Sequence, residues 1–173
     1  MDNLSLFFLI FSLSNHSALI DTLMIFGARF IIYLTFLLMF ILSFKGGTKE
    51  RKALIVAILA IPIIILLIKG IHIFFYENRP YIDYQLTPLI PPYEPDASFP
   101  SRHASIMSGI AFAYIYFKSK WAPLFLILLL WVGISRIYVG VHYPLDILGG
   151  IIVGLVSAIL ALQLSRFLKS KLL

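Results

Sequence analysis

The sequence predicts an all-α fold, a polytopic membrane helical bundle of five spanning helices with an interfacial helix at its N-terminus. Of its 173 residues, 61% are hydrophobic and 13% are charged, whereas a soluble domain is about half apolar and about a quarter charged. The mean hydropathy is +0.98. Several apolar runs approach or exceed the roughly 20 residues that cross the hydrocarbon core of a bilayer. We expect residues 1–173 to form one integral membrane domain.

The predicted helices are joined by short connections, with one long exception. The run 4–13 is too short to span, and we expect it to lie in the membrane interface. The long connection, 78–100, holds six of the nine prolines, and long connections of this kind are usually functional. The five spans are expected at 19–44, 53–76, 103–117, 121–138 and 144–167, and the third of them is short.

Two features inside these spans concern packing. Arg29 is a charge within the first span, which makes it a functional candidate by default. We favour instead a structural pairing with Asp21, which lies about two helical turns away. Gly150 and Gly154 form a small-x3-small pair on the last span, and we expect it to pack closely against the third span, which is rich in small residues.

The distribution of lysine and arginine predicts the orientation of the bundle, because cytoplasmic loops carry an excess of these residues. One side of the predicted topology holds nine cations, whereas most acidic residues fall on the other side. The N-terminus is therefore expected outside and the C-terminus in the cytoplasm. The nine cations are Lys45, Lys49, Arg51, Lys52, Lys118, Lys120, Arg166, Lys169 and Lys171.

Composition also limits the classes of function. The net charge of +6 could indicate binding to nucleic acid, but the clustering of cations on one side of the membrane explains it better. We therefore expect a membrane bilayer and no nucleic acid as the partner. The chain has no cysteine, which excludes disulfides and cysteine-ligated metals.

Three polar clusters interrupt the apolar pattern, all on the predicted outer side. They are Arg79 with Pro80, then 100–103 (Pro-Ser-Arg-His), then Ser135-Arg136 followed by His142 and Asp146. Three arginines and two histidines on one membrane face predict a pocket for a strongly anionic group. Helices that begin near residues 103 and 144 would point their N-termini at this pocket, and helix N-termini favour phosphate.

A phosphate pocket that carries out hydrolysis needs a nucleophile and an acid. A neutral histidine nitrogen can attack phosphorus, and an acceptor must then hold the other ring nitrogen. Asp146 lies four residues after His142 and suits that role, which leaves His103 as the general acid for the leaving oxygen. Arg79 and Arg136 offer planar donor forks for phosphate oxygens, and Ser101 is a predicted helix N-cap at the same pocket.

The same residues resemble the type 2 phosphatidic acid phosphatase superfamily, whose pattern is Lys-x6-Arg-Pro, Pro-Ser-x-His and Ser-Arg-x5-His-x3-Asp. Residues 79–80, 100–103 and 135–146 match the end of the first motif and the whole of the other two. The segments 96–101 and 138–144 look most like bacterial undecaprenyl-diphosphate phosphatases of the bacitracin-resistance group. The resemblance implies a membrane lipid phosphatase that needs no metal and no other cofactor.

The first motif departs from the family pattern. His72 stands where the family has lysine, and Lys69 is the nearest lysine, one turn earlier. We predict that His72, rather than Lys69, takes the phosphate-facing position. Arg102 occupies the variable position of the second motif, where it could supply the permanent charge that a neutral imidazole lacks.

The predicted function is hydrolysis of a polyprenyl diphosphate, of undecaprenyl type, to the monophosphate through a phosphohistidine. The enzyme would lie in the plasma (inner) membrane with its site facing outward and a phosphorylated membrane lipid as substrate. One alternative is the same chemistry on phosphatidic acid or phosphatidylglycerol phosphate. A second alternative is a lipid-carrier binding protein or transporter, although binding alone does not require His142 and Asp146 together. The sequence predicts neither the prenyl length nor the oligomeric state.

Overall fold

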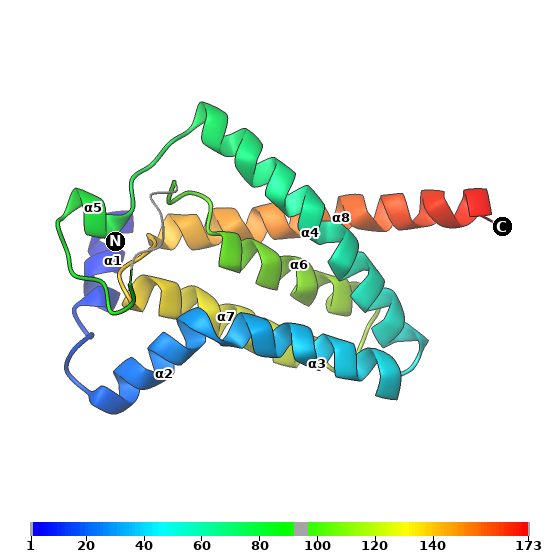
Figure 1. The fold of residues 1–173 in the computed structure, drawn as a ribbon, viewed down its shortest axis with the longest axis horizontal. Helices are drawn as coiled ribbons and strands as arrows, with labels where there is room; N and C mark the ends of the chain where they lie inside the picture. Colours follow the sequence, from blue (N-terminus) through cyan, green and yellow to red (C-terminus); the bar gives the residue numbers. More distant parts are fainter. Residues whose placement is uncertain (1, 92–96, 173) are drawn as a thin grey trace.

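The computed structural model describes residues 2–91 and 97–172, which form eight helices and no strand. The helices α3, α4, α6, α7 and α8 run roughly along the long axis, whereas α1 lies across one end (Figure 1). The two termini lie at opposite ends of the bundle (Figure 1). The helices are α1 (Asn3–Phe11), α2 (Ala18–Arg29), α3 (Ile31–Lys45), α4 (Thr48–Phe74), α5 (Pro80–Asp83), α6 (Arg102–Tyr116), α7 (Ala122–Tyr138) and α8 (Pro144–Leu172).

The predicted first span, 19–44, is wrong in one respect, because it is not a single straight helix. It consists of α2 and α3, which meet at Phe30 with a bend of 57°. In an unbroken helix the carbonyl of Ala28 would accept from the N–H of residue 32. That carbonyl instead accepts a hydrogen bond from Nη1 of Arg136, at 3.3 Å. A side chain inserted into the helical hydrogen-bond ladder is a recognised cause of a sharp kink.

The expected pairing of Arg29 with Asp21 is also wrong for the described residues. The carboxylate of Asp21 accepts from the hydroxyl of Tyr138 at 2.7 Å and from the backbone N–H of Asn15 at 3.1 Å. Arg29 lies over the ring of Phe30, 5.8 Å from its centroid. Asp21 therefore fixes the start of α2 to the end of α7.

The fold is helical as predicted, but length and composition do not confirm all five predicted spans. In the described part of the chain, α4 and α8 are long and apolar enough to cross a membrane, and the bent pair α2–α3 makes a third candidate. The helix α7 has 17 residues and α6 has 15. Much of α6 is buried between its neighbours, so it contains small and polar residues where a lipid-exposed helix would be apolar.

The close packing predicted for α6 and α8 is confirmed. A Cβ atom on Gly150 would lie 2.7 Å from the carbonyl oxygen of Ser101 and 2.8 Å from the Cβ of Ala104. A Cβ atom on Gly154 would lie 2.7 Å from the Cβ of Ser108. Only glycine permits the two backbones to approach so closely. This contact sets the N-terminus of α6 beside the N-terminus of α8.

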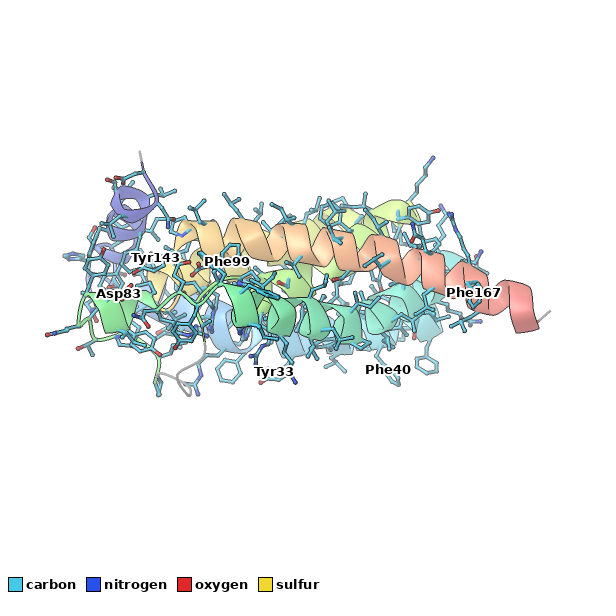
Figure 2. All side chains as sticks on the ribbon, turned by 90° about the horizontal axis from the view of Figure 1, so that it is seen from above. Tyr33, Phe40, Asp83, Phe99, Tyr143 and Phe167 are labelled. Carbon is cyan, nitrogen blue, oxygen red and sulfur yellow. The ribbon has the colours of Figure 1, made fainter. Side chains whose placement is uncertain are left out.

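The outside of the bundle is covered with large apolar side chains. Phe74 is 89% exposed and Tyr33 is 69% exposed, and Tyr33 and Phe40 project away from the ribbon (Figure 2). A soluble protein rarely exposes apolar area of this extent. Together with the apolar helices, this surface identifies an integral membrane protein.

Candidate active site

The three polar clusters meet at the end of the bundle that carries α1 and α5 (Figure 1). Arg79 directly precedes α5, and Ser101 directly precedes α6. Arg136 lies in the last turn of α7, His142 in the connection that follows, and Asp146 in the first turn of α8. The antiparallel course of the helices thus gathers residues that are far apart in the sequence.

His142 and Asp146 form a buried pair. The Nδ1 atom of His142 lies 3.2 Å from Oδ2 of Asp146. The same Oδ2 atom accepts the backbone N–H of Tyr143 at 2.8 Å. His142 is 2% exposed and Asp146 is fully buried. The start of α8 therefore holds the carboxylate beneath the imidazole.

Arg79 fixes which nitrogen of His142 carries the proton. Its Nη1 atom lies 3.2 Å from Nε2 of His142 and also donates to the carbonyl of Val141 at 3.2 Å. A guanidinium has donors and no acceptor, so Nε2 must offer its lone pair. The proton then resides on Nδ1, where it is donated to Asp146. This is the tautomer that a nucleophilic Nε2 requires.

The surroundings of His142 also keep its ring neutral. Burial lowers the pKa of His142 well below its usual range, and the positive charges of Arg136 and Arg79 lower this pKa further. Both effects disfavour the imidazolium form. The lone pair on Nε2 is therefore retained at neutral pH.

The segment that carries Arg79 is held against this pair. The hydroxyl of Tyr143 donates to the carboxylate of Asp83 at 3.0 Å, and the side-chain amide of Asn78 donates to the same carboxylate at 3.1 Å. Figure 2 shows Asp83 and Tyr143 at the same end of the bundle. Arg79 is the N-cap residue of the short helix that ends at Asp83, so these contacts restrict its position.

Ser98 contacts the pair and was not assigned a role from the sequence. Its hydroxyl donates to Oδ2 of Asp146 at 2.5 Å and lies 3.4 Å from Nδ1 of His142. The residue is fully buried. A serine in a proline-rich connection gives no sign of such a contact.

The start of α6 is fixed to α8 by its capping residue. The hydroxyl of Ser101 accepts the backbone N–H of Ala104 at 3.5 Å, and the backbone N–H of Ser101 donates to the carbonyl of Asp146 at 3.0 Å. The next two residues, Arg102 and His103, begin α6; Arg102 is exposed and His103 is half-buried. Burial disfavours the protonated form of His103, and so do the charges of Arg136, Arg102 and Arg79 and the neighbouring His142.

Comparison with known proteins agrees with this arrangement of motifs. Residues 51–169 match the PAP2 superfamily, the type 2 phosphatidic acid phosphatases. The chain belongs to this superfamily. It is 30% identical over 167 residues to the undecaprenyl-diphosphatase BcrC of Bacillus subtilis (strain 168). The matched region covers 96% of this chain and 86% of that protein. The resemblance found in the motifs is therefore confirmed.

Two further relatives extend the comparison. The putative undecaprenyl-diphosphatase YbjG of Escherichia coli (strain K12) is 30% identical over 160 residues, covering 92% of this chain and 80% of that protein. The crystal structure of Aquifex aeolicus LpxE superposes with a TM-score of 0.70 at 25% identity, covering 93% of this chain and 94% of that chain. The protein is thus a membrane phosphatase of the PAP2 superfamily.

The remaining predicted PAP2 site residues occupy different surroundings. Arg136 is 3% exposed, and its Nη1 atom is used in the contact with Ala28 at the α2–α3 bend. On α4, His72 is half-buried and Lys69 is exposed. The more enclosed position of His72 suits a residue that faces the pocket, but its contact with phosphate stays a prediction.

A metal site was not predicted for this PAP2 protein. Within residues 2–91 and 97–172, no three histidine, cysteine or acidic side chains form a group that could hold a metal ion. Glu94 and Asp96, two acidic residues of the long connection 78–100, lie outside the described residues.

Proposed function

We propose that this PAP2 protein hydrolyses a polyprenyl diphosphate to the monophosphate and inorganic phosphate. The observation that carries the proposal is the arrangement of partners around His142. The acceptor Asp146 faces Nδ1, and the donor Arg79 faces Nε2. The choice of substrate is supported by the relatives named undecaprenyl-diphosphatase.

In the first chemical step, Nε2 of His142 attacks the terminal phosphorus. The bond between this phosphorus and the bridging oxygen breaks. His103, whose protonated form the negative charge of the bound diphosphate would favour against the nearby arginines, donates a proton to that oxygen, so that polyprenyl monophosphate leaves. Arg79, which lies 3.2 Å from Nε2, would then bind the oxygens of the transferring group. Charge stabilisation of this kind carries most of the catalysis in phosphoryl transfer.

In the second step, water attacks the phosphohistidine. The N–P bond breaks, inorganic phosphate leaves, and His103 accepts a proton from the water, which restores both histidines. Asp146 stabilises the positive charge that His142 carries while it is phosphorylated. The N-termini of α6 and α8 add partial positive charge, and Ser101 and Arg136 would hold further phosphate oxygens.

The proposed site faces the outside of the plasma membrane. It lies at the end of the bundle opposite the α3–α4 connection, the α6–α7 connection and the C-terminus (Figure 1). Those three regions carry the nine cations that predict the cytoplasmic side.

Single cysteines test this orientation, because the chain has no cysteine of its own. Thr48 and Pro91 are both exposed. Thr48 begins α4 at one end of the bundle, and Pro91 lies two residues after Leu89, whose N–H donates to the carbonyl of Val139 at the other end. A cysteine in place of Thr48 is expected to react with an impermeant maleimide only after the membrane is opened, and one in place of Pro91 in intact cells. The reverse pattern would place the site in the cytoplasm.

Release of inorganic phosphate by the purified protein tests the activity. Undecaprenyl diphosphate, phosphatidic acid and phosphatidylglycerol phosphate are compared in the same detergent, each with and without EDTA. We expect the highest kcat/KM for the diphosphate and no effect of EDTA. A preference for either phospholipid would overturn the proposed substrate. Binding of the lipids without any phosphate release would favour a carrier-binding protein instead.

A further inference from the structure

In the part of the chain that the structure describes, the carboxylate of Asp146 receives all of its hydrogen bonds on one oxygen. Oδ2 accepts from Ser98 at 2.5 Å, from the backbone of Tyr143 at 2.8 Å and from His142 at 3.2 Å. The other oxygen, Oδ1, is buried and has no hydrogen-bond partner among the described residues. The orientation of the carboxylate therefore depends on the groups that hold Oδ2.

These three donors are not equivalent in the proposed reaction. His142 is the reacting group, and the N–H of Tyr143 belongs to the backbone of the residue next to it. Within residues 2–91 and 97–172, Ser98 is thus the one side chain that holds Oδ2 independently of the histidine. Without it, the carboxylate could rotate and take Oδ2 away from Nδ1 of His142.

The direction of the hydrogen bonds is consistent with a single arrangement of protons. The hydroxyl of Ser98 donates its only hydrogen to Asp146, and its oxygen then remains an acceptor. The Nδ1–H group of His142 points at this acceptor, 3.4 Å away, as well as at Asp146. Ser98 therefore favours the tautomer of His142 in which Nε2 carries the lone pair.

The backbone of Ser98 is also fixed. Its N–H donates to the carbonyl of Glu77 at 2.8 Å, and Glu77 lies two residues before Arg79. One residue thus joins the segment that carries Arg79 to the buried pair. We infer that Ser98 is a positioning residue that holds the Asp146 carboxylate and the Nδ1–H tautomer of His142. The inference rests on the proposed function, in which His142 is the nucleophile.

The inference is tested by kinetics of Ser98→Ala with the diphosphate substrate. The variant loses a hydrogen bond to a buried charge, so kcat is expected to fall about 10- to 100-fold. KM and inhibition by vanadate are expected to stay unchanged. Ser98→Cys has a side chain of similar shape with a weak donor. Its kcat is expected to lie between those of Ser98→Ala and the wild type. Ser108→Ala is the matched control, because Ser108 is another buried serine whose hydroxyl donates to a backbone carbonyl, that of Ile151.

A double-mutant cycle separates positioning from a general structural role. If Ser98 acts through the carboxylate, Ser98→Ala should change kcat less than about threefold when Asp146→Asn is already present. Equal losses in both backgrounds, a loss in KM alone, or a kcat of Ser98→Ala equal to that of Ser108→Ala would overturn the inference. If the wild type hydrolyses no phospholipid or prenyl diphosphate, the proposed function fails and the inference fails with it. A normal Ser98→Ala beside an inactive His142→Ala overturns the inference alone.

Discussion

Among residues 2–91 and 97–172, each end of the bundle holds one buried carboxylate, and the two accept hydrogen bonds from similar groups. Asp146 is fully buried at one end, and Glu50 is 7% exposed at the other. Each accepts a serine hydroxyl, from Ser98 at 2.5 Å and from Ser119 at 3.0 Å. Each also accepts from the backbone, Asp146 from the N–H of Tyr143 and Glu50 from the N–H of Gly47.

The difference lies in the third partner. Asp146 faces Nδ1 of His142, which has Arg79 on its other side. Glu50 caps the start of α4 by accepting from Gly47, and Ser119 ties it to the connection before α7. A buried, hydrogen-bonded carboxylate by itself is only a structural device. In the proposed function it gains a chemical role, because it orients a histidine whose other nitrogen faces Arg79.

The largest expected effect on activity at this pair of carboxylates comes from Asp146→Asn. The amide cannot stabilise positive charge on His142, so kcat should fall by about 100- to 10,000-fold while residual turnover persists. Phosphate release from the diphosphate measures the loss. Full activity in this variant would make Asp146 equivalent to Glu50 and erase the distinction between the two ends.

A smaller and more selective effect is expected from Arg102→Gly. Arg102 is exposed at the start of α6 and acts electrostatically on His103 and His142. Loss of one charged donor should lower kcat/KM for the diphosphate about tenfold, and lower it much less for a monophosphate. Lys118→Gly is the control at the other end, because Lys118 is also exposed and has a φ of 50° that glycine adopts without strain. Equal losses on both substrates would show that Arg102 does not discriminate between them.

The pH dependence of kcat/KM tests whether the ring of His142 is neutral beside Asp146. Burial, with Arg136 and Arg79, lowers the pKa of His142, and a lowered pKa keeps the ring neutral as the pH falls. Loss of the nucleophile should therefore begin only below the ordinary histidine value of about 6.5. An acid limb centred above that value would show that His142 is not in the buried, neutral state described here.

The smallest effect on activity is expected from Glu50→Gln. The substitution weakens the contacts with Gly47 and Ser119, so the free energy of unfolding should fall by about 1–3 kcal/mol. At a temperature where the variant is folded, kcat should equal that of the wild type. Thermal unfolding in detergent and phosphate release measure the two quantities, and a selective loss of kcat would contradict a purely structural role.

The sequence predicted the features that depend on local pattern. Apolar runs predicted the helices, and the glycine pair on α8 predicted its contact with α6, because both follow from spacing along one helix. Motif spacing placed Asp146 four residues after His142, within reach of its ring. The lysine and arginine bias placed the charged connections together, although the compartment they face stays a prediction.

The features that the sequence did not predict depend on contacts between distant residues. The bend at Phe30 arises where Arg136 reaches Ala28, 108 positions away. Ser98 meets Asp146 across 48 positions, and a serine carries no sign of that partner in its own neighbourhood. Such contacts appear only when the helices are packed.

The central claim is that the imidazole above Asp146 becomes phosphorylated. Rapid acid-free quenching of the enzyme with a diphosphate labelled in its terminal phosphorus tests it directly. We expect an acid-labile, alkali-stable phosphoprotein whose label maps to His142, and no label in a folded His142→Ala protein. Turnover by the wild type with no trapped phosphohistidine, or with label on His103 instead, would contradict the account.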